Sequence, residues 1–522
     1  MASSRDSTLI AGAAACALAF WALCVVQRVF VGPLGVDEIY FAHVLWLVGQ
    51  GQRLYVDFHS QHLPTYFLLM KPLVSAVSPG PSDLEFVWAM RGVSAAMLLA
   101  YLVIGWFLHR MLPVGGRLGL LAVWSLLLLF VVHARFLELR ADSVGLLLMN
   151  TAWAAALSRV SRPRLLLAAV LAGASVLFSG RAGFMALAAG GCLLYLAYRA
   201  RDMRAFRALI FTALAFAAVL AAIYWSDPAW TTLVVQSAVL DPVQFIIPLS
   251  LWRRIVPLDR AILLFLIVIA LLSGLRMVRR GQAERGIVVA GASVGQLLLI
   301  FIDPVPYQYV YGWATVPVLF GVVSLSRRFA ALFSGGMAVL YLPGVFPLVA
   351  ATPFSPPQGS LFQPVIGPVL SREVVQRIAT PELVRMMLNG EWQQNLASQL
   401  RVREEVCRRV GGKVLVSWAF HPICLPDANY HWTGLRWPIP VQGVVTGSGR
   451  SMDEFEFLGI ITTTKPSLFV WLPGPGRSPR LPRTLEQTLT TCYDRFEGFA
   501  LPNSRPCREA KPQRTPAELL PS

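Results

Sequence analysis

The chain has 522 residues, of which 56% are hydrophobic and only 14% are charged, and its mean hydropathy is +0.59. A soluble protein carries about 25% charged residues. The deficit is concentrated before residue 350, so the composition excludes an ordinary soluble enzyme and predicts a polytopic membrane protein. The net charge of +17 is spread over many short clusters instead of one patch, which argues against nucleic acid as a partner.

Apolar runs in residues 1–350 predict an all-α membrane domain with about 11 transmembrane helices. The first run, 8–30, lacks a clear cleavage site for a signal peptidase, so we interpret it as a retained helix. The other spans are expected at about 85–108, 118–134, 143–158, 165–180, 182–198, 208–225, 260–275, 286–302, 309–326 and 329–350. Segments 38–51 and 64–78 are apolar but too short to cross, which predicts helices lying along the outer interface. The assignment of 226–259 stays open.

Basic residues fall in short clusters in every second loop, and the intervening loops hold nearly all the acidic residues. This alternation follows the positive-inside rule. It places the N-terminus in the cytoplasm and, because the number of spans is odd, the C-terminal portion outside. Arginine far exceeds lysine, which fits a GC-rich genome. We therefore expect a multi-pass protein of a bacterial inner (plasma) membrane.

Residues 351–522 have an ordinary charge content and predict a small extracytoplasmic, periplasmic α/β domain after the membrane domain of residues 1–350. A proline-rich linker at 353–357 precedes a helical pattern at 371–409 and strand-like runs at 413–418 and 466–472. The tail after about 503 is expected to be disordered. Four cysteines of this domain predict two disulfides in an oxidising compartment, most simply Cys407–Cys424 and Cys492–Cys507. Four free buried thiols are the alternative.

Asp37 and Glu38 stand just beyond the first predicted span, and further polar residues follow in the same outer loop. The exit of a transmembrane helix more often carries Trp, Tyr or a basic anchor. A solvated loop would explain the sign of the charge, but not why carboxylates, imidazoles and aromatic rings crowd between two interfacial helices. We therefore expect chemistry at the lipid–water boundary, with Asp37 and Glu38 as candidate catalytic carboxylates. The other polar residues of this loop are Arg53, Asp57, His59 and His62.

The next outer loop adds Glu138, Arg140 and Asp142. In a helix Glu138 and Asp142 share one face. Charges this close to a membrane are costly unless they are paired or functional, so an ion pair at the helix end and a catalytic role are both open. Arg181 lies between two apolar helices and suits an anionic lipid headgroup, because guanidinium makes bidentate contacts with phosphate. A snorkelling interfacial arginine is the alternative.

With these residues in this order, the chain resembles the GT-C-fold glycosyltransferases that use lipid-phosphate sugars, near the protein O-mannosyltransferases and the aminoarabinose transferases. The resemblance covers roughly residues 8–330. It rests on Asp37-Glu38 after the first span, Tyr55 to Pro64, Arg140-x-Asp142, Ser179 to Gly183, and Tyr307-x-Tyr309. The aminoarabinose-type pattern has Lys-Pro-Pro where this chain has His62-Leu63-Pro64, and Arg where it has Tyr40. These departures leave the sugar and the acceptor open.

The resemblance implies a GT-C-like fold and a reaction with a polyprenyl-phosphate-linked sugar donor. Asp37 would be the catalytic carboxylate, and Asp142 or Glu138 the second acid. Arg181 would hold the donor phosphate with help from Arg140 or His62, and Tyr309 is a further candidate. A hexosyl or pentosyl group would pass to a glycan, lipid or protein acceptor of the cell envelope, by inverting single displacement.

Two other classes of protein remain open at this stage. A transporter or flippase of lipid-linked sugars would show broken helices with charges at mid-membrane. A non-catalytic assembly or receptor protein would use the outer domain as its binding module. No cofactor is required by the spacing of the candidates, although a divalent metal beside the first carboxylates would suit their hard oxygen ligands. Membrane lipids are the expected surroundings.

Overall fold

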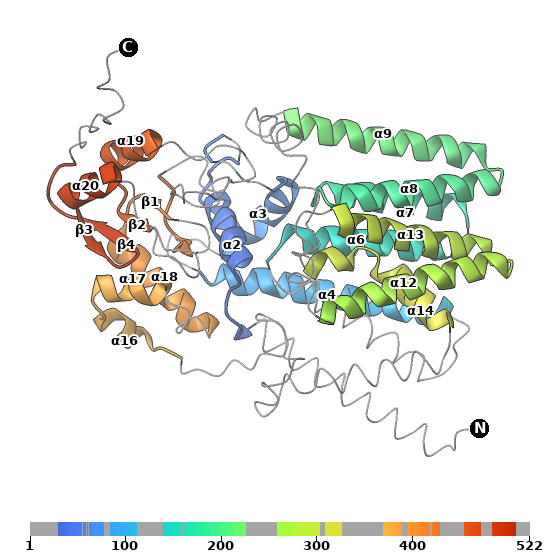
Figure 1. Cartoon of the computed structure of the whole chain (residues 1–522), viewed down its shortest axis with the longest axis horizontal. Helices are drawn as coiled ribbons and strands as arrows, with labels where there is room; N and C mark the ends of the chain where they lie inside the picture. The colour runs from blue at the N-terminus through green and yellow to red at the C-terminus, as the bar shows by residue number, and fades with distance from the viewer. Residues whose placement is uncertain are drawn as a thin grey trace, which may run out of the picture.

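The computed structural model describes residues 30–54, 56–58, 60, 62–77, 84–111, 139–158, 160–225, 258–302, 308–325, 369–388, 395–416, 420–428, 454–470 and 483–507. The described part is mostly helical, with a small sheet near the C-terminus (Figure 1). Several predicted segments lie outside the described residues, apart from a few residues at their ends. These are the spans at 8–30, 118–134 and 329–350, the segment 226–259 whose assignment was open, and the tail after about 503.

A bundle of long helices forms the larger part of the described structure (Figure 1). Each member coincides with a predicted span to within several residues, which confirms a helix at each of these positions. The 3-10 turn η2 (Gln308–Gly312) leads into the last of them. The members are α4 (Phe86–Met111), α6 (Ala141–Leu157), α7 (Arg162–Val176), α8 (Ala182–Arg199), α9 (Met203–Trp225), α12 (Leu258–Arg279), α13 (Ala283–Ile302) and α14 (Thr315–Leu325).

Within the described ranges, four helices are long and apolar enough to cross a membrane: Phe86–Leu108, Ala182–Arg199, Met203–Ile223 and Ala283–Phe301. Their outer surfaces carry large apolar side chains, including Leu187 at 77% and Phe211 at 70% exposure. Contact of this much apolar surface with water is unfavourable, whereas contact with the hydrocarbon of lipid is not. The bundle therefore has the character of a membrane-associated domain.

Gly274 of α12 and Gly286 of α13 allow these two helices to touch. A Cβ added at Gly286 would lie 2.6 Å from the carbonyl oxygen of Gly274 and 2.8 Å from the backbone nitrogen of Val278. Because these are backbone atoms, the helices would have to separate. We expect Gly286→Ala to lower the free energy of unfolding by about 1–3 kcal/mol, measured by thermal unfolding in detergent. The control is Gly190→Ala on α8, where the new Cβ meets nothing within 4 Å.

Two shorter helices lie between the bundle and the C-terminal domain in Figure 1: α2 (Val36–Gly49) and α3 (Thr65–Val77). They match the segments predicted to lie along the interface. One continuous apolar core contains residues of α2, α3, the start of α4 and the C-terminal helices. The C-terminal domain is therefore packed directly onto the two helices that follow the first predicted span.

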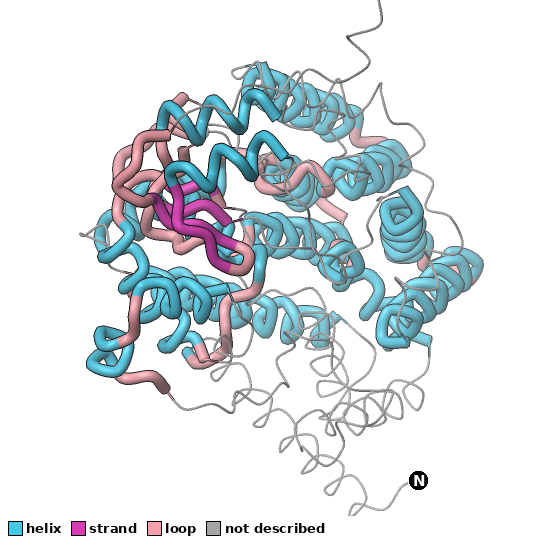
Figure 2. The backbone as a smooth tube through the Cα atoms, turned by 60° about the vertical axis from the view of Figure 1, so that its left-hand side comes forward, coloured by secondary structure: helices cyan, strands magenta, loops and turns pink. Residues whose placement is uncertain are grey.

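The C-terminal domain combines helices with a four-stranded sheet of order β1-β2-β4-β3, whose strands are magenta in Figure 2. β1 and β2 are parallel, and β4 pairs antiparallel with both β2 and β3. Gly498, at φ 82°, supplies the turn of the β3–β4 hairpin. The elements are α16 (Arg372–Arg377), α17 (Thr380–Leu388), α18 (Leu396–Val410), β1 (Val414–Leu415), α19 (Glu454–Thr464), β2 (Leu468–Val470), α20 (Arg483–Cys492), β3 (Tyr493–Phe496) and β4 (Phe499–Pro502).

Both predicted disulfides are present. Cys407 of α18 is bonded to Cys424, and Cys492 at the end of α20 is bonded to Cys507. The first bridge ties the loop 420–428 to α18. The second holds the chain after β4 against α20. The helical pattern predicted at 371–409 is divided into α16, α17 and α18 instead of forming one helix.

Candidate active site

The first turn of α2 carries the two acidic residues that the sequence singled out. Gly35, in an extended conformation, precedes the helix, and its N–H donates to Glu38 Oε2 at 2.9 Å. Carboxylates are favourable here because the helix dipole leaves partial positive charge at the N-terminus. The start of the helix therefore explains why two carboxylates are favourable at this position. Their side chains, however, have very different surroundings.

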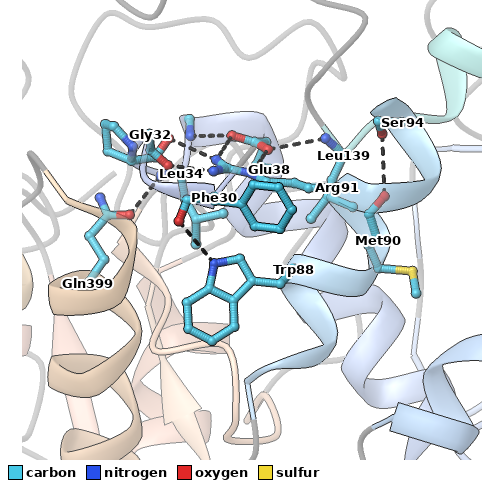
Figure 3. Close-up of polar contacts among 12 residues, drawn as sticks. Phe30, Gly32, Leu34, Glu38, Trp88, Met90, Arg91, Ser94, Leu139 and Gln399 are labelled. Carbon is cyan, nitrogen blue, oxygen red and sulfur yellow. Dashed lines mark hydrogen bonds and ion pairs between the residues drawn. The ribbon is translucent and has the colours of Figure 1, made fainter. Parts of the chain in front are cut away.

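Glu38 is fully buried and paired with Arg91 of α4 (Figure 3). Arg91 Nε and Nη2 donate to the two carboxylate oxygens at 2.9 and 2.7 Å, and Leu139 N–H donates to Oε1 at 3.3 Å. Arg91 also donates to the carbonyl oxygens of Gly32 and Pro33. Glu38 thus joins α2, α4 and the start of α6. This geometry departs from the catalytic role predicted for Glu38 and favours a structural one.

Asp37, by contrast, keeps 29% of its side chain exposed. Its Oδ2 lies 2.7 Å from Nη1 of Arg140, which immediately precedes α6 and is itself buried. Nη2 of the same arginine lies 3.7 Å from Asp142 Oδ2. Asp142 Oδ1 accepts a hydrogen bond from Ser179 Oγ at 2.6 Å. Arg140 therefore stands between two carboxylates, and Ser179 ties the corner between α7 and α8 to the start of α6.

His62, from the loop between α2 and α3, borders the same group of charges. Its ring packs against Phe41 and Tyr40 at centroid distances of 4.7 and 5.3 Å. Burial lowers the pKa of His62 to about 4, and the charges of Asp142, Arg140, Asp37 and Arg181 also act on it. The ring is therefore neutral at neutral pH. It can exchange hydrogen bonds with a ligand, but it does not bring the positive charge that the predicted phosphate-binding role would use.

Arg181, at the start of α8, acts electrostatically on both His62 and Asp142. It follows Ser179 by two residues, so the Ser179–Asp142 hydrogen bond also fixes its backbone near the site. The structure thus brings together Asp37, Arg140, Asp142, His62 and Arg181. Two other predicted site residues cannot be placed: Glu138 lies outside the described residues, and the side chain of Tyr309 is not described.

The arrangement does not suit a metal shared by the predicted carboxylates. Glu38 is saturated by Arg91, and the guanidinium of Arg140 lies where a divalent cation bridging Asp37 and Asp142 would have to bind. Hard cations need carboxylate oxygens that are turned toward one point. The candidate site therefore does not offer a metal ion the set of free carboxylate oxygens that it would need.

An apolar cavity of about 650 Å³ lies between α7, α8 and α9. Gly180, the residue before Arg181, lines it, and so do Phe184 and Leu187 of α8 and Leu209 and Leu220 of α9. Since Leu209 and Leu220 are three helical turns apart, the cavity runs along the bundle from the neighbourhood of the charged group.

Sequence reasoning missed Arg91 and the buried cluster of His43, His421 and Asp427. The sequence did contain a signal for Arg91. It lies inside a predicted span, and a charged residue there needs a partner. Nothing local links His43 to a residue 384 positions away. No family model, curated protein or solved structure matches this chain.

Proposed function

We propose that this protein is an integral-membrane glycosyltransferase of GT-C-like architecture, which transfers a sugar from a polyprenyl-phosphate donor to a glycan, lipid or protein acceptor. The observation that supports this most is the meeting of Asp37 with Arg140, His62 and Arg181, which come from four separate segments. A solvated loop would have no reason to gather a partly exposed carboxylate and two arginines at the end of an apolar bundle.

The apolar cavity supports a donor with a long hydrocarbon tail. Its lining residues are almost all apolar, and it begins at Gly180, beside Arg181. A phosphate bound by Arg181 would leave the attached chain free to follow the cavity along α8 and α9. An amphiphile with an anionic head is the ligand that this combination of charge and apolar space fits.

Asp37 is the group that would activate the acceptor. It takes the proton of the acceptor hydroxyl as that oxygen bonds to the anomeric carbon, and the bond from this carbon to the phosphate oxygen breaks with its electron pair on the phosphate. Arg140 and Arg181 balance the charge that develops on the leaving phosphate. Asp142 is buried, accepts a hydrogen bond from Ser179 and orients Arg140. One carboxylate facing one phosphate implies inversion at the anomeric carbon.

The proposal includes the membrane topology. We place about 11 spans in the inner (plasma) membrane of a bacterium, with the N-terminus in the cytoplasm and residues 351–522 in the periplasm. The chemistry then takes place on the extracytoplasmic side, where nucleotide sugars are absent and a lipid-linked donor is required. The two disulfides of the C-terminal domain support an oxidising compartment.

A transporter of lipid-linked sugars is the second candidate, because the chain before α14 is not a continuous helix. Two buried amides hold this segment inside the bundle. Asn150 donates to Gly312 O at 2.9 Å and accepts from Val316 N–H, while Gln296 donates to Val310 O. Interrupted helices are typical of transporters. Both amides are neutral, however, whereas the charged groups lie at the end of the bundle.

Reconstitution in liposomes separates the two candidates. With a polyprenyl-phosphate sugar labelled in the sugar, the transferase moves the label to an added acceptor and releases polyprenyl phosphate. The transporter moves the labelled donor across the bilayer intact. Movement without product, over a panel of glycan, lipid and peptide acceptors, would contradict the proposal.

We expect Arg181→Gln to raise the KM for the donor roughly 10- to 100-fold, because a charge-assisted contact with phosphate is worth about 1.5–3 kcal/mol. Initial transfer rates at varied donor concentration measure this. Arg162→Gln is the matched control, since Arg162 begins α7 and pairs with Asp202 in an exposed ion pair. An unchanged KM in a folded Arg181 variant would remove this arginine from the donor site.

A further inference from the structure

A second buried polar cluster lies where α2 meets the C-terminal domain. His43 Nε2 of α2 lies 2.7 Å from Asp427 Oδ2, and His421 Nε2 lies 3.1 Å from Asp427 Oδ1. Both imidazoles are 0% exposed and the carboxylate 4%. The two rings are in contact, with centroids 3.7 Å apart. The proposed transfer reaction uses none of these residues.

The backbone of Ile423 determines where the protons of this cluster lie. Its N–H donates to His421 Nδ1 at 2.9 Å, so that nitrogen has no proton and His421 Nε2 carries one, which it donates to Asp427. The carbonyl oxygen of Ile423 lies 2.6 Å from His43 Nδ1. A carbonyl can only accept, so His43 Nδ1 carries a proton. Its other nitrogen faces a carboxylate oxygen, and two lone pairs at 2.7 Å would repel.

We infer that His43 carries protons on both ring nitrogens, and that the resulting buried ion pair with Asp427 fastens α2 to the C-terminal domain. The surrounding groups agree. Burial would raise the pKa of Asp427, but His43 and His421 hold it below its usual value, so the carboxylate stays charged. Burial lowers the pKa of His421 to about 4, which keeps that ring neutral. Arg403, another cation beside this cluster, donates to His421 O.

A metal held by the same three residues fits this geometry less well. His421 Nε2 carries the proton, since Nδ1 accepts from Ile423 N–H, and therefore has no lone pair for a metal. The contacts of 2.7 and 3.1 Å are hydrogen-bond lengths. Ligand atoms around a tetrahedral zinc ion stand roughly 3.3 Å apart.

The ion pair makes His43 a positioning residue for the helix that carries Asp37. The chain before α2 is held by the same domain, because Leu396 N–H donates to Val31 O at 2.9 Å and Leu34 N–H donates to Gln399 Oε1 at 2.7 Å. The second of these contacts appears in Figure 3. α2 is thus attached to α18 and the loop 420–428 on both sides of Asp37. This inference does not depend on the proposed reaction.

Nitrogen NMR of the wild-type protein in nanodiscs tests the protonation directly. His43 is the only histidine of the seven that follows an alanine, so labelling Ala with carbonyl ¹³C and His with ¹⁵N assigns its signals. Both ring nitrogens of His43 should carry protons, as the carbonyl oxygen of Ile423 and the carboxylate of Asp427 at the two ends of the ring require. An unprotonated ring nitrogen on His43, or one equivalent of bound zinc in the purified protein, would overturn the inference.

Hydrogen–deuterium exchange tests the attachment. Asp427→Asn leaves the charge of His43 buried without its partner, so exchange in both α2 and residues 420–428 should rise on the order of a hundredfold. The double variant His43→Gln/Asp427→Asn, which removes both charges, should exchange more slowly than Asp427→Asn. Asp57→Asn, which breaks the exposed pair with Arg53, is the control and should affect its own loop alone. Unchanged exchange in α2 of the Asp427→Asn variant would contradict the attachment. If that variant fails to fold, the NMR measurement on the wild-type protein still tests the ion pair.

Discussion

Asp37→Asn should lower the kcat of sugar transfer by roughly 10²–10⁴-fold, the usual contribution of a general base. The amide keeps the size of the side chain but cannot take up the proton of the acceptor hydroxyl. Arg140 retains Asp142 as a charged neighbour, 3.7 Å away, so the fold around the start of α6 should persist. The KM for the donor should change much less than kcat, because the phosphate is assigned to the arginines.

Single-turnover transfer in liposomes measures this effect, with donor in excess of its KM. Asp57→Asn is the matched control: this carboxylate lies in the loop that follows α2 and is paired with Arg53 in an exposed contact. Its rate should equal that of the wild type. A folded Asp37→Asn protein with full activity would remove Asp37 from the chemistry, and with it the central assignment of the proposed mechanism.

Helices and disulfides that depend on residues close together in the sequence could be predicted. The helices α6 to α9 follow from apolar runs of the right length, and the Cys407–Cys424 and Cys492–Cys507 bridges follow from cysteine count and spacing. These depend on local burial and on short loop closure, which sequence separation describes well.

The different surroundings of Asp37 and Glu38 could not be predicted. The two residues are adjacent and chemically similar, and only the direction of α2 relative to α4 decides which carboxylate meets Arg91. The same holds for His43, whose partner Asp427 is 384 residues away. Such contacts are made by packing, and one sequence carries no local trace of them. The sequence could single out these segments as candidates, but the surroundings of each acid within them depended on the fold.

The largest effect on stability should come from Arg91→Leu. This change leaves Glu38 as a fully buried carboxylate without its cation, and removing one partner of a buried ion pair costs about 3–5 kcal/mol. The carbonyl oxygens of Gly32 and Pro33 lose a donor as well. Chemical denaturation in mixed micelles measures the loss of unfolding free energy. Arg162→Leu is the control, since the side chain of Arg162 is 46% exposed and its ion pair should contribute no more than about 1 kcal/mol.

Two further variants separate a structural Glu38 from a catalytic one. Glu38→Leu/Arg91→Leu removes both charges and should recover part of the stability lost in Arg91→Leu, although Gly35 and Leu139 N–H then lack an acceptor. Glu38→Gln should lose stability, while the molecules that remain folded transfer sugar at close to the wild-type kcat. If Glu38→Gln instead kept its stability and lost its activity, Glu38 would act in the chemistry and the structural role argued from its contacts would be wrong. The ratio of kcat to folded fraction decides between the two, because a structural residue changes how many molecules are active and a catalytic residue changes how fast each one works.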